Sequence, residues 1–365
     1  MRHPSRHTPA TAAAAGGIMA LAVGFAPAAA ASPAPQTSVP CSTTALASAI
    51  SGAVSGDTLV LAPGCSYQVS DPLPDISTNL TIDGRGATLD ADGPESPGYN
   101  ILGVPDGVTV HIRYLNFTCG GSYIGQCGEA IRTSGNVTIE GGTFYELGPI
   151  YNEYGLGGGG AIGNGGQLAV TGATFDWNFA TGSGGAIYNA GQLTVTATRF
   201  ADNNAQYGSG GAIYNGGTMT VSSSTFRSND GSAIGNGGQA TLRQDTLSGN
   251  GARTLGGAIG NGGTLIVIST SIINGASGYA GGAIANEYGG QVTLLRDTLS
   301  GNSAYYGGAI YNVGALTASF TTIVNNDASA AAGGIGNLGG TVLLQVDHIQ
   351  SNKPSNCVNV PGCTG

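Results

Sequence analysis

Charged side chains are scarce in this sequence: only 8% of its 365 residues are Asp, Glu, Lys or Arg, and the formal net charge is −9. Lys353 is the single lysine, and the arginines are scattered along the chain. Proteins that bind nucleic acids neutralise phosphates with clustered basic side chains. The composition therefore excludes nucleic acid as a partner.

Long apolar runs are missing after the N-terminal segment. A helix that crosses a bilayer needs about 20 consecutive apolar residues, so we expect no transmembrane segment. The N-terminus carries Arg2 and Arg6, then an alanine-rich apolar stretch over 12–25, and small residues before Ser32. This order is typical of a secretory signal peptide. We expect a signal peptide over 1–31 with cleavage after Ala31, and a secreted chain over 32–365 that is extracellular or associated with the cell surface.

Metal-binding patterns are also lacking. The histidines beyond the signal segment, His111 and His348, are far apart, and no Cys-x-x-Cys pair occurs. The string DADG at 90–93 has part of a calcium loop, but the rest of the loop spacing and its terminal glutamate are absent. We expect no metal and no cofactor.

The six cysteines lie outside the regular part of the chain. In an exported protein they indicate disulfides rather than metal ligands. Sequence alone allows about 15 pairings of six cysteines, and closeness along the chain favours Cys41 with Cys65, Cys119 with Cys127, and Cys357 with Cys363.

What the sequence does contain is a repeat, Gly-Gly-Ala-Ile-Tyr-Asn-Gly-Gly, which returns with small changes. Successive copies of its isoleucine are 25, 26, 21, 25, 25, 26 and 25 residues apart. A period of this length indicates a solenoid, a propeller or another array. The isoleucines are Ile162, Ile187, Ile213, Ile234, Ile259, Ile284, Ile310 and Ile335.

Each repeat has the pattern of short strands. In the unit 210–229, Met219 and Val221 alternate with polar residues, so one face is expected inside and one in water. Apolar residues at helical spacing are not found in these units, and glycine punctuates them. Because strands this short cannot bury an apolar face alone, stacking of successive units predicts an all-β, single-stranded parallel β-helix, right-handed like most parallel connections. We expect about eleven or twelve coils and a monomer.

Two polar columns accompany the repeat. The asparagine two residues after each core isoleucine, as in Asn215, is expected to stack as a hydrogen-bonded ladder. A Phe-x-x-Asn pattern, as in Phe226 with Asn229, predicts a second column, interrupted where Gly275 replaces the asparagine. At the start of the chain, Ser42 and Gly52 flank an apolar stretch over 44–50, which predicts a short helix that covers the N-terminal end.

The paired Gly-Gly-Ala-Ile and Phe-x-x-Asn motifs, over about 128–352, resemble the repeats of the polymorphic outer-membrane protein (Pmp) family, within the pectin-lyase-like superfamily. The strings SGDTLVLAPG at 55–64 and IDGRG at 82–86 resemble the first coils of pectin-lyase-like proteins. The Pmp resemblance implies a surface-exposed adhesion domain, whereas the superfamily includes both enzymes and inert scaffolds. Because the sequence ends at Gly365, soon after the repeats, we expect no C-terminal barrel of the autotransporter kind.

Exposed tyrosines on a stiff scaffold offer large apolar contact area at small entropic cost, which suits glycan or protein binding. We therefore expect a non-catalytic scaffold for adhesion or for binding an extracellular glycan or a cell-surface protein. The alternative for these tyrosines is that they only cover the flank of the β-helix. The candidate binding residues are Tyr188, Tyr207, Tyr214, Tyr279, Tyr305, Tyr306 and Tyr311.

The competing hypothesis is a polysaccharide lyase or glycoside hydrolase. Enzymes of these classes need clustered carboxylates, or a basic residue set against them, and the repeats contain few. One step, from Ile131 to Ile162, is lengthened to 31 residues and gathers charge. A catalytic cluster would be sought there, among Glu129, Arg132, Glu140, Glu146 and Glu153.

A third hypothesis is ice binding through outward Thr-x-Thr rows, such as Thr194 with Thr196 and Thr218 with Thr220. Ice binding demands a regular flat face. In the sequence these rows break at 242–244, which argues against this function.

Overall fold

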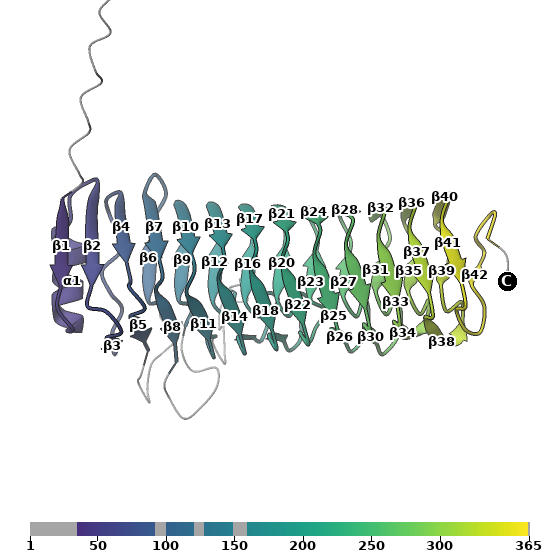
Figure 1. Ribbon diagram of the computed structural model, residues 1–365, viewed down its shortest axis with the longest axis horizontal. Helices are drawn as coiled ribbons and strands as arrows, with labels where there is room; N and C mark the ends of the chain where they lie inside the picture. The colour runs from purple at the N-terminus through teal and green to yellow at the C-terminus, as the bar shows by residue number, and fades with distance from the viewer. Residues whose placement is uncertain (1–34, 92–99, 120–127, 149–158, 364–365) are drawn as a thin grey trace, which may run out of the picture. The chain divides into compact units, whose positions relative to one another are not determined.

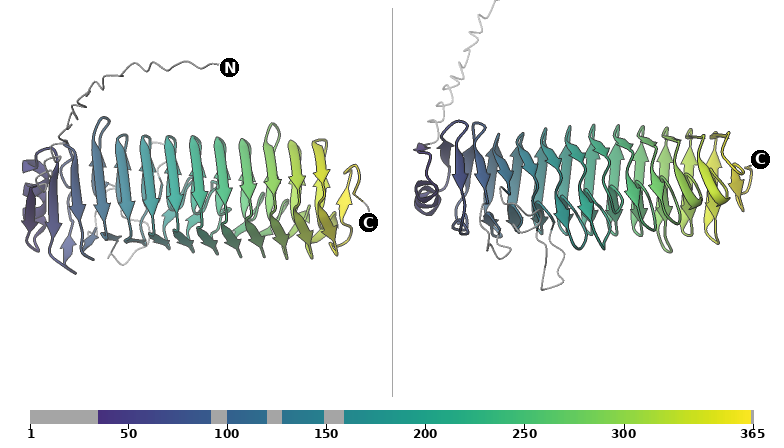
Figure 2. Two further views of the ribbon diagram at one scale, coloured as in Figure 1. Left: turned by 45° about the horizontal axis from the view of Figure 1, so that its top comes forward. Right: turned by 90° about the horizontal axis from the view of Figure 1, so that it is seen from below.

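The computed structural model describes residues 35–91, 100–119, 128–148 and 159–363, and it shows a parallel β-helix (Figure 1). Each regular coil contributes one strand to each of three long sheets, called here sheets A, B and C. All pairs between successive coils are parallel, so each sheet runs the length of the helix (Figure 2). The predicted architecture is confirmed.

Sheet A has 13 strands, most of them five residues long with the second and fourth residues turned inward. Its strands are β1 (Gln36–Val39), β2 (Asp57–Leu61), β4 (Leu80–Asp83), β7 (Thr109–Arg113), β10 (Asn136–Glu140), β13 (Gln167–Thr171), β17 (Gln192–Thr196), β21 (Thr218–Ser222), β24 (Gln239–Arg243), β28 (Thr264–Ile268), β32 (Gln291–Leu295), β36 (Ala315–Ser319) and β40 (Thr341–Gln345).

Sheet B has 12 strands and carries the phenylalanine column. Its strands are β3 (Ser66–Gln68), β5 (Thr88–Asp90), β8 (Asn116–Thr118), β11 (Thr143–Tyr145), β14 (Thr174–Asp176), β18 (Arg199–Ala201), β22 (Thr225–Arg227), β25 (Thr246–Ser248), β29 (Ser271–Ile273), β33 (Thr298–Ser300), β37 (Thr322–Val324) and β41 (His348–Gln350).

Sheet C has 11 strands and carries the isoleucine of each repeat. Its strands are β6 (Leu102–Val104), β9 (Ile131–Thr133), β12 (Ile162–Asn164), β16 (Ile187–Asn189), β20 (Ile213–Asn215), β23 (Ile234–Asn236), β27 (Ile259–Asn261), β31 (Ile284–Asn286), β35 (Ile310–Asn312), β39 (Ile335–Asn337) and β42 (Cys357–Val358).

Short strands also form in the links that lead from sheet B back to sheet C, and the repeat did not predict them. They pair in two small sheets. The first contains β15 (Phe179–Ala180) and β19 (Asn204–Ala205), and the second contains β26 (Gly251–Ala252), β30 (Ala276–Ser277), β34 (Ser303–Tyr306) and β38 (Asp327–Ala331).

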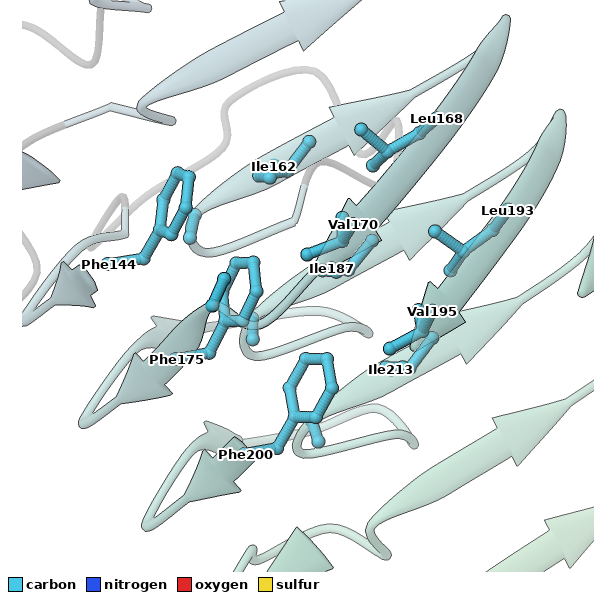
Figure 3. Close-up of a cluster of buried hydrophobic side chains, with 14 of the residues drawn as sticks. Phe144, Ile162, Leu168, Val170, Phe175, Ile187, Leu193, Val195, Phe200 and Ile213 are labelled. Carbon is cyan, nitrogen blue, oxygen red and sulfur yellow. The ribbon is translucent and has the colours of Figure 1, made fainter. Parts of the chain in front are cut away.

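The core is a set of stacked identical side chains (Figure 3). Ile162, Ile187 and Ile213 are in register on sheet C, and each is fully buried. The rings of Phe144 and Phe175 on sheet B stack with centroids 4.5 Å apart. Because the strand spacing is about 4.8 Å, like side chains in neighbouring coils stack in contact, and the phenylalanine column continues as Leu247 and Ile272 in later coils.

The asparagine ladders are formed as expected. Asn189 donates from Nδ2 to Oδ1 of Asn215 at 2.7 Å, and Asn215 donates to Asn236 at 2.8 Å. In the second ladder Asn203 donates to Asn229 at 2.9 Å. These asparagines are buried but satisfied, as buried polar groups normally are.

The N-terminal end is covered by β1 and by α1 (Thr43–Gly52), whose N-cap Ser42 accepts a hydrogen bond from the Ala45 N–H. Helix α1 confirms the expected short helix, while β1, which precedes the first predicted strand, was missed. Disulfides join Cys41 to Cys65 and Cys357 to Cys363, as predicted. Cys127, the expected partner of Cys119, lies outside the described residues, as does the expected signal peptide. In the part of the chain that is described, no helix is long and apolar enough to span a membrane.

Candidate functional site

The outer face of sheet C carries the residue that lies between each isoleucine and asparagine. Tyr188 and Tyr214 occupy this position on β16 and β20, half-buried, with their rings stacked 5.2 Å apart. On the next two strands the position is Gly235 and Gly260. A stacked aromatic pair therefore stands beside a floor without large side chains.

A groove of about 490 Å³ lies over this floor. It follows from the shortest repeat, the 21-residue step between Ile213 and Ile234, in which Asp230 alone joins the ladder residue Asn229 to Gly231. The links of the coils on either side are longer. Gln206 to Ser209 line the groove on one side, and Ala252 to Leu255 line it on the other.

The lining of the groove combines aromatic, charged and amide groups. Tyr207 is 79% exposed at the rim, while the Tyr214 hydroxyl comes within 3.2 Å of the place where a Cβ on Gly237 would lie. Arg253 and Glu287 are exposed and also line the groove. Within the described ranges Arg253 forms no ion pair, so its guanidinium is available to a ligand.

Asp230 is held in place by its own surroundings. One carboxylate oxygen accepts a hydrogen bond from Asn204 Nδ2 at 3.2 Å, and the other accepts from the Gly231 N–H at 2.9 Å. Both oxygens are thus partly engaged at the wall of the groove. Sequence reasoning did not identify Asp230, Arg253 or Glu287 as site residues. The signal that could have found them is the unequal length of neighbouring links.

The other candidate tyrosines form a second group on sheet C and the neighbouring links. Tyr306 meets Tyr279 edge-on with ring centroids 5.6 Å apart, and Tyr305 edge-on at 4.6 Å. The charge of the neighbouring Tyr305 raises the pKa of Tyr306, and burial raises the pKa of half-buried Tyr311. The hydroxyls of Tyr306 and Tyr311 therefore stay protonated at neutral pH.

In the charged region around the lengthened repeat, the structure brings Glu129 and Arg132 together. Arg132 Nε lies 3.1 Å from Glu129 Oε2, and the Glu129 side chain is only 3% exposed. Its carboxylate lies against Gly163 on the next strand of sheet C. Burial raises the pKa of Glu129, although the hydrogen bond and the charge of Arg132 oppose this effect.

The other members of that region lie elsewhere. Glu140 ends β10 on sheet A and pairs with Arg113 at 3.2 Å. Glu146 follows β11 of sheet B, and Glu153 lies outside the described residues. Residues that are close in sequence are thus distributed over three differently oriented sheets.

No group of three or more metal-ligating side chains occurs among the described residues. Near the incomplete calcium loop, Asp83 pairs with Arg85 at 3.2 Å, and Asp90 accepts a hydrogen bond from Gln68 at 3.0 Å. Asp92 lies outside the described part of the chain.

Comparisons with known proteins support the fold. Residues 106–247 match the family model described as a right handed beta helix region, whereas no curated protein matches the chain. A structure of a PL6 alginate lyase in complex with a trisaccharide is similar with a TM-score of 0.44 and 13% identity, covering 91% of this chain and 89% of that one.

A mutant of the PL6 alginate lyase AlyGC is similar with a TM-score of 0.37 and 13% identity, covering 86% of this chain and 54% of that one. We draw no functional conclusion from likenesses of this size. The sequence motifs suggested the Pmp repeat family in particular, but what these findings support is the broader statement that the chain folds as a right-handed parallel β-helix.

Proposed function

We propose that this protein is a secreted, non-catalytic scaffold that binds an extracellular polysaccharide in the groove on sheet C. The observation that carries the proposal is the groove itself, placed directly beside the stacked pair Tyr188 and Tyr214. A ligand lying on its glycine floor would contact the Tyr214 ring along one wall and Arg253 along the other.

The chemistry of the lining suits a sugar ring. Sugars present apolar C–H faces and many hydroxyls, so their sites pair aromatic rings with a few well-placed polar groups. Here Tyr207 and Tyr214 supply the rings, and Glu287 supplies a hydrogen-bond acceptor. Arg253 supplies donors for hydroxyls or for an acidic sugar.

The setting agrees with an extracellular role in adhesion. The N-terminal pattern is that of a secretory signal peptide, and the disulfides Cys41–Cys65 and Cys357–Cys363 suit an oxidising compartment. A rigid solenoid also holds its binding residues in place before a ligand arrives, which lowers the entropic cost of binding.

The test is affinity electrophoresis of the purified chain against neutral and acidic polysaccharides, followed by calorimetry with oligosaccharides of the one that retards it. We expect Tyr214→Ala and Arg253→Ala to weaken binding by about tenfold or more, the effect of losing about 1.4 kcal/mol. Tyr288, which is 90% exposed and outside the groove, provides the control variant Tyr288→Ala. Equal affinity of Tyr214→Ala and Tyr288→Ala would refute the groove as the site.

A polysaccharide lyase or hydrolase is the second candidate function, and one observation favours it. Glu129 is a buried carboxyl with a raised pKa beside Arg132, on the sheet that also carries Tyr188. A carboxyl whose pKa is raised towards neutrality suits acid or base catalysis.

A depolymerisation assay over the same polysaccharides, with and without added calcium, distinguishes the two functions. Product release that is lost in Glu129→Gln and kept in Glu140→Gln would establish the enzyme. If the protein binds a polysaccharide but releases no product from any polysaccharide tested, the result supports the scaffold function.

A further inference from the structure

The outward face of sheet A differs from the rest of the surface. The residues that point away from the core on β13 to β40 are uncharged except for Arg243, and none is aromatic. Charged or aromatic side chains lie at the borders of this strip: Arg113 pairs with Glu140 on the preceding strands β7 and β10, and at the corner towards sheet B the Arg296 guanidinium lies 5.8 Å from the centre of the Phe320 ring. On a chain with a net charge of −9, this neutral strip stands out.

Threonine dominates the central column of this face. The strand register places the central outward residues in one line along the helix axis. Each of its threonines is exposed or half-exposed. From β2 to β40 the column reads Thr58, Thr81, His111, Thr138, Ala169, Thr194, Thr220, Thr241, Ile266, Thr293, Thr317 and Leu343.

The register carries the central column through the break that the sequence suggested at 242–244, whereas the neighbouring outward row does break there, because Arg243 takes the position of Thr196 and Ser222. Leu242 points into the core and is fully buried, so it does not belong to the face. The outward residues of β24 are Gln239, Thr241 and Arg243, and Thr241 continues the central column from Thr220. The column is interrupted one strand later, by Ile266, and then resumes with Thr293.

The spacing of the column fits ordered water. Neighbouring strands repeat at about 4.8 Å. Water molecules joined by hydrogen bonds of about 2.75 Å in tetrahedral geometry place their second neighbours about 4.5 Å apart. Each threonine has a hydroxyl that can donate and accept hydrogen bonds with water. Beside it lies a methyl group that forms no hydrogen bonds, so water must order around it. Successive threonines therefore present hydroxyls close to the spacing of a tetrahedral water lattice.

We propose that the outward face of sheet A binds the surface of ice. A neutral crystal of water needs no charged partner, and the strip supplies almost none. The absence of aromatic rings separates this face from sheet C, where the tyrosines gather. The views in Figure 2 show sheet A as a long, regular array of parallel strands, which gives the extended flat face that contact with a crystal surface requires.

The test measures the fraction of the purified full chain taken up by slowly growing ice, together with inhibition of ice recrystallisation. We expect uptake by the wild-type protein. Thr220→Tyr and Thr241→Tyr each place a bulky ring in the centre of the face and are expected to abolish it. Thr246→Tyr is the matched control, because Thr246 is exposed on sheet B in the same coil as Thr241. Circular dichroism verifies that each variant is folded.

Exclusion of the folded wild-type protein from ice would overturn the proposal. So would equal loss of uptake in Thr241→Tyr and Thr246→Tyr. Adsorption to a neutral crystalline polysaccharide, lost in Thr241→Tyr and without uptake by ice, would also overturn it and assign the face to another solid. Tyr214→Ala is expected to keep full uptake by ice, so this result is independent of the groove on sheet C.

Discussion

The corner between sheets A and B contains a column of Ser, Thr and Asp residues whose side chains accept hydrogen bonds from the coil before. Thr270 N–H donates to Asp297 Oδ1 at 2.8 Å, and Leu295 N–H donates to Asp297 Oδ2 at 2.7 Å. The Thr198 N–H donates instead to a hydroxyl oxygen, Ser224 Oγ, at 3.1 Å. A carboxylate and a hydroxyl thus fill the same structural position.

Asp297 makes stability depend on pH. It is 1% exposed, and burial raises its pKa from 3.8 to about 7, although its two backbone hydrogen bonds oppose the rise. The folded state therefore holds this proton more tightly than the unfolded chain does. Protonated Asp297 therefore contributes fully to the stability of the fold below pH 3.8, and this contribution is lost as the pH rises towards 7. The difference between these pKa values corresponds to about 4 kcal/mol at most.

The prediction is that Asp297→Thr stabilises the protein at pH 8 and has a much smaller effect at pH 4. Denaturant unfolding of both proteins at the two pH values gives the free energies of unfolding. The difference in the free energy of unfolding between the variant and the wild type should increase by up to about 4 kcal/mol from pH 4 to pH 8. Asp327→Thr, at an exposed position, should show no such widening. A gap for Asp297→Thr that is the same at both pH values would refute the reasoning.

Further predictions concern three successive residues of β20. Ile213→Asp would bury an unpaired carboxylate between Ile187 and Ile234 and should destabilise the fold by several kcal/mol, about 3 to 5, measured by thermal unfolding. Asn215→Ala should cost less, about 1 to 3 kcal/mol, because it removes one acceptor of the Asn189 amide and the donor to Asn236 Oδ1 without burying a charge. Tyr214→Ala should leave the melting temperature nearly unchanged, since its side chain lies outside the core. If Tyr214→Ala unfolded the protein while Ile213→Asp was tolerated, the inward and outward assignment would be wrong.

The fold could be predicted because the same residue types recur at the same positions of each repeat. The isoleucine, the alternation of Met219 with Thr220, and the ladder residue Asn215 recur in phase, so one interpretation explained every unit. Strand β1 and the link strands β15, β19, β26, β30, β34 and β38 escaped this reasoning. They are short or lie before the first repeat, and backbone pairing between coils defines them rather than a pattern of side chains.

The site was harder to predict, because the groove forms where one repeat is shorter than its neighbours. The sequence analysis looked for a site in the lengthened repeat with Glu146 and Glu153, whereas the cavity forms where Asp230 alone spans a shortened link. The charged region failed to form one cluster for a related reason. Glu129 and Glu140 are close along the chain, but a coil turns its successive strands towards different sides.

The asparagine ladders have a direction. Each amide donates an N–H to the amide oxygen of the next coil, except Asn250, whose neighbour in the next coil is Gly275, so the donors of both columns point towards the C-terminus. The first asparagine of each column has no earlier amide to donate to its Oδ1, and a backbone N–H takes that place. The Gly166 N–H donates to Asn164 Oδ1, and the Leu147 N–H donates to Asn178 Oδ1.

The last members need the opposite, an acceptor for the final N–H. Asn337 donates to the Asn359 carbonyl at 3.0 Å, and Asn352 donates to Asn356 Oδ1 at 3.1 Å. Both acceptors lie in the segment that precedes Cys363, which a disulfide ties back to Cys357. The two ends of this solenoid are thus not interchangeable. Whole coils could be gained or lost between them without disturbing the direction of either column, but a protein cut short before this segment would lose the acceptor for one N–H of Asn337 and one N–H of Asn352.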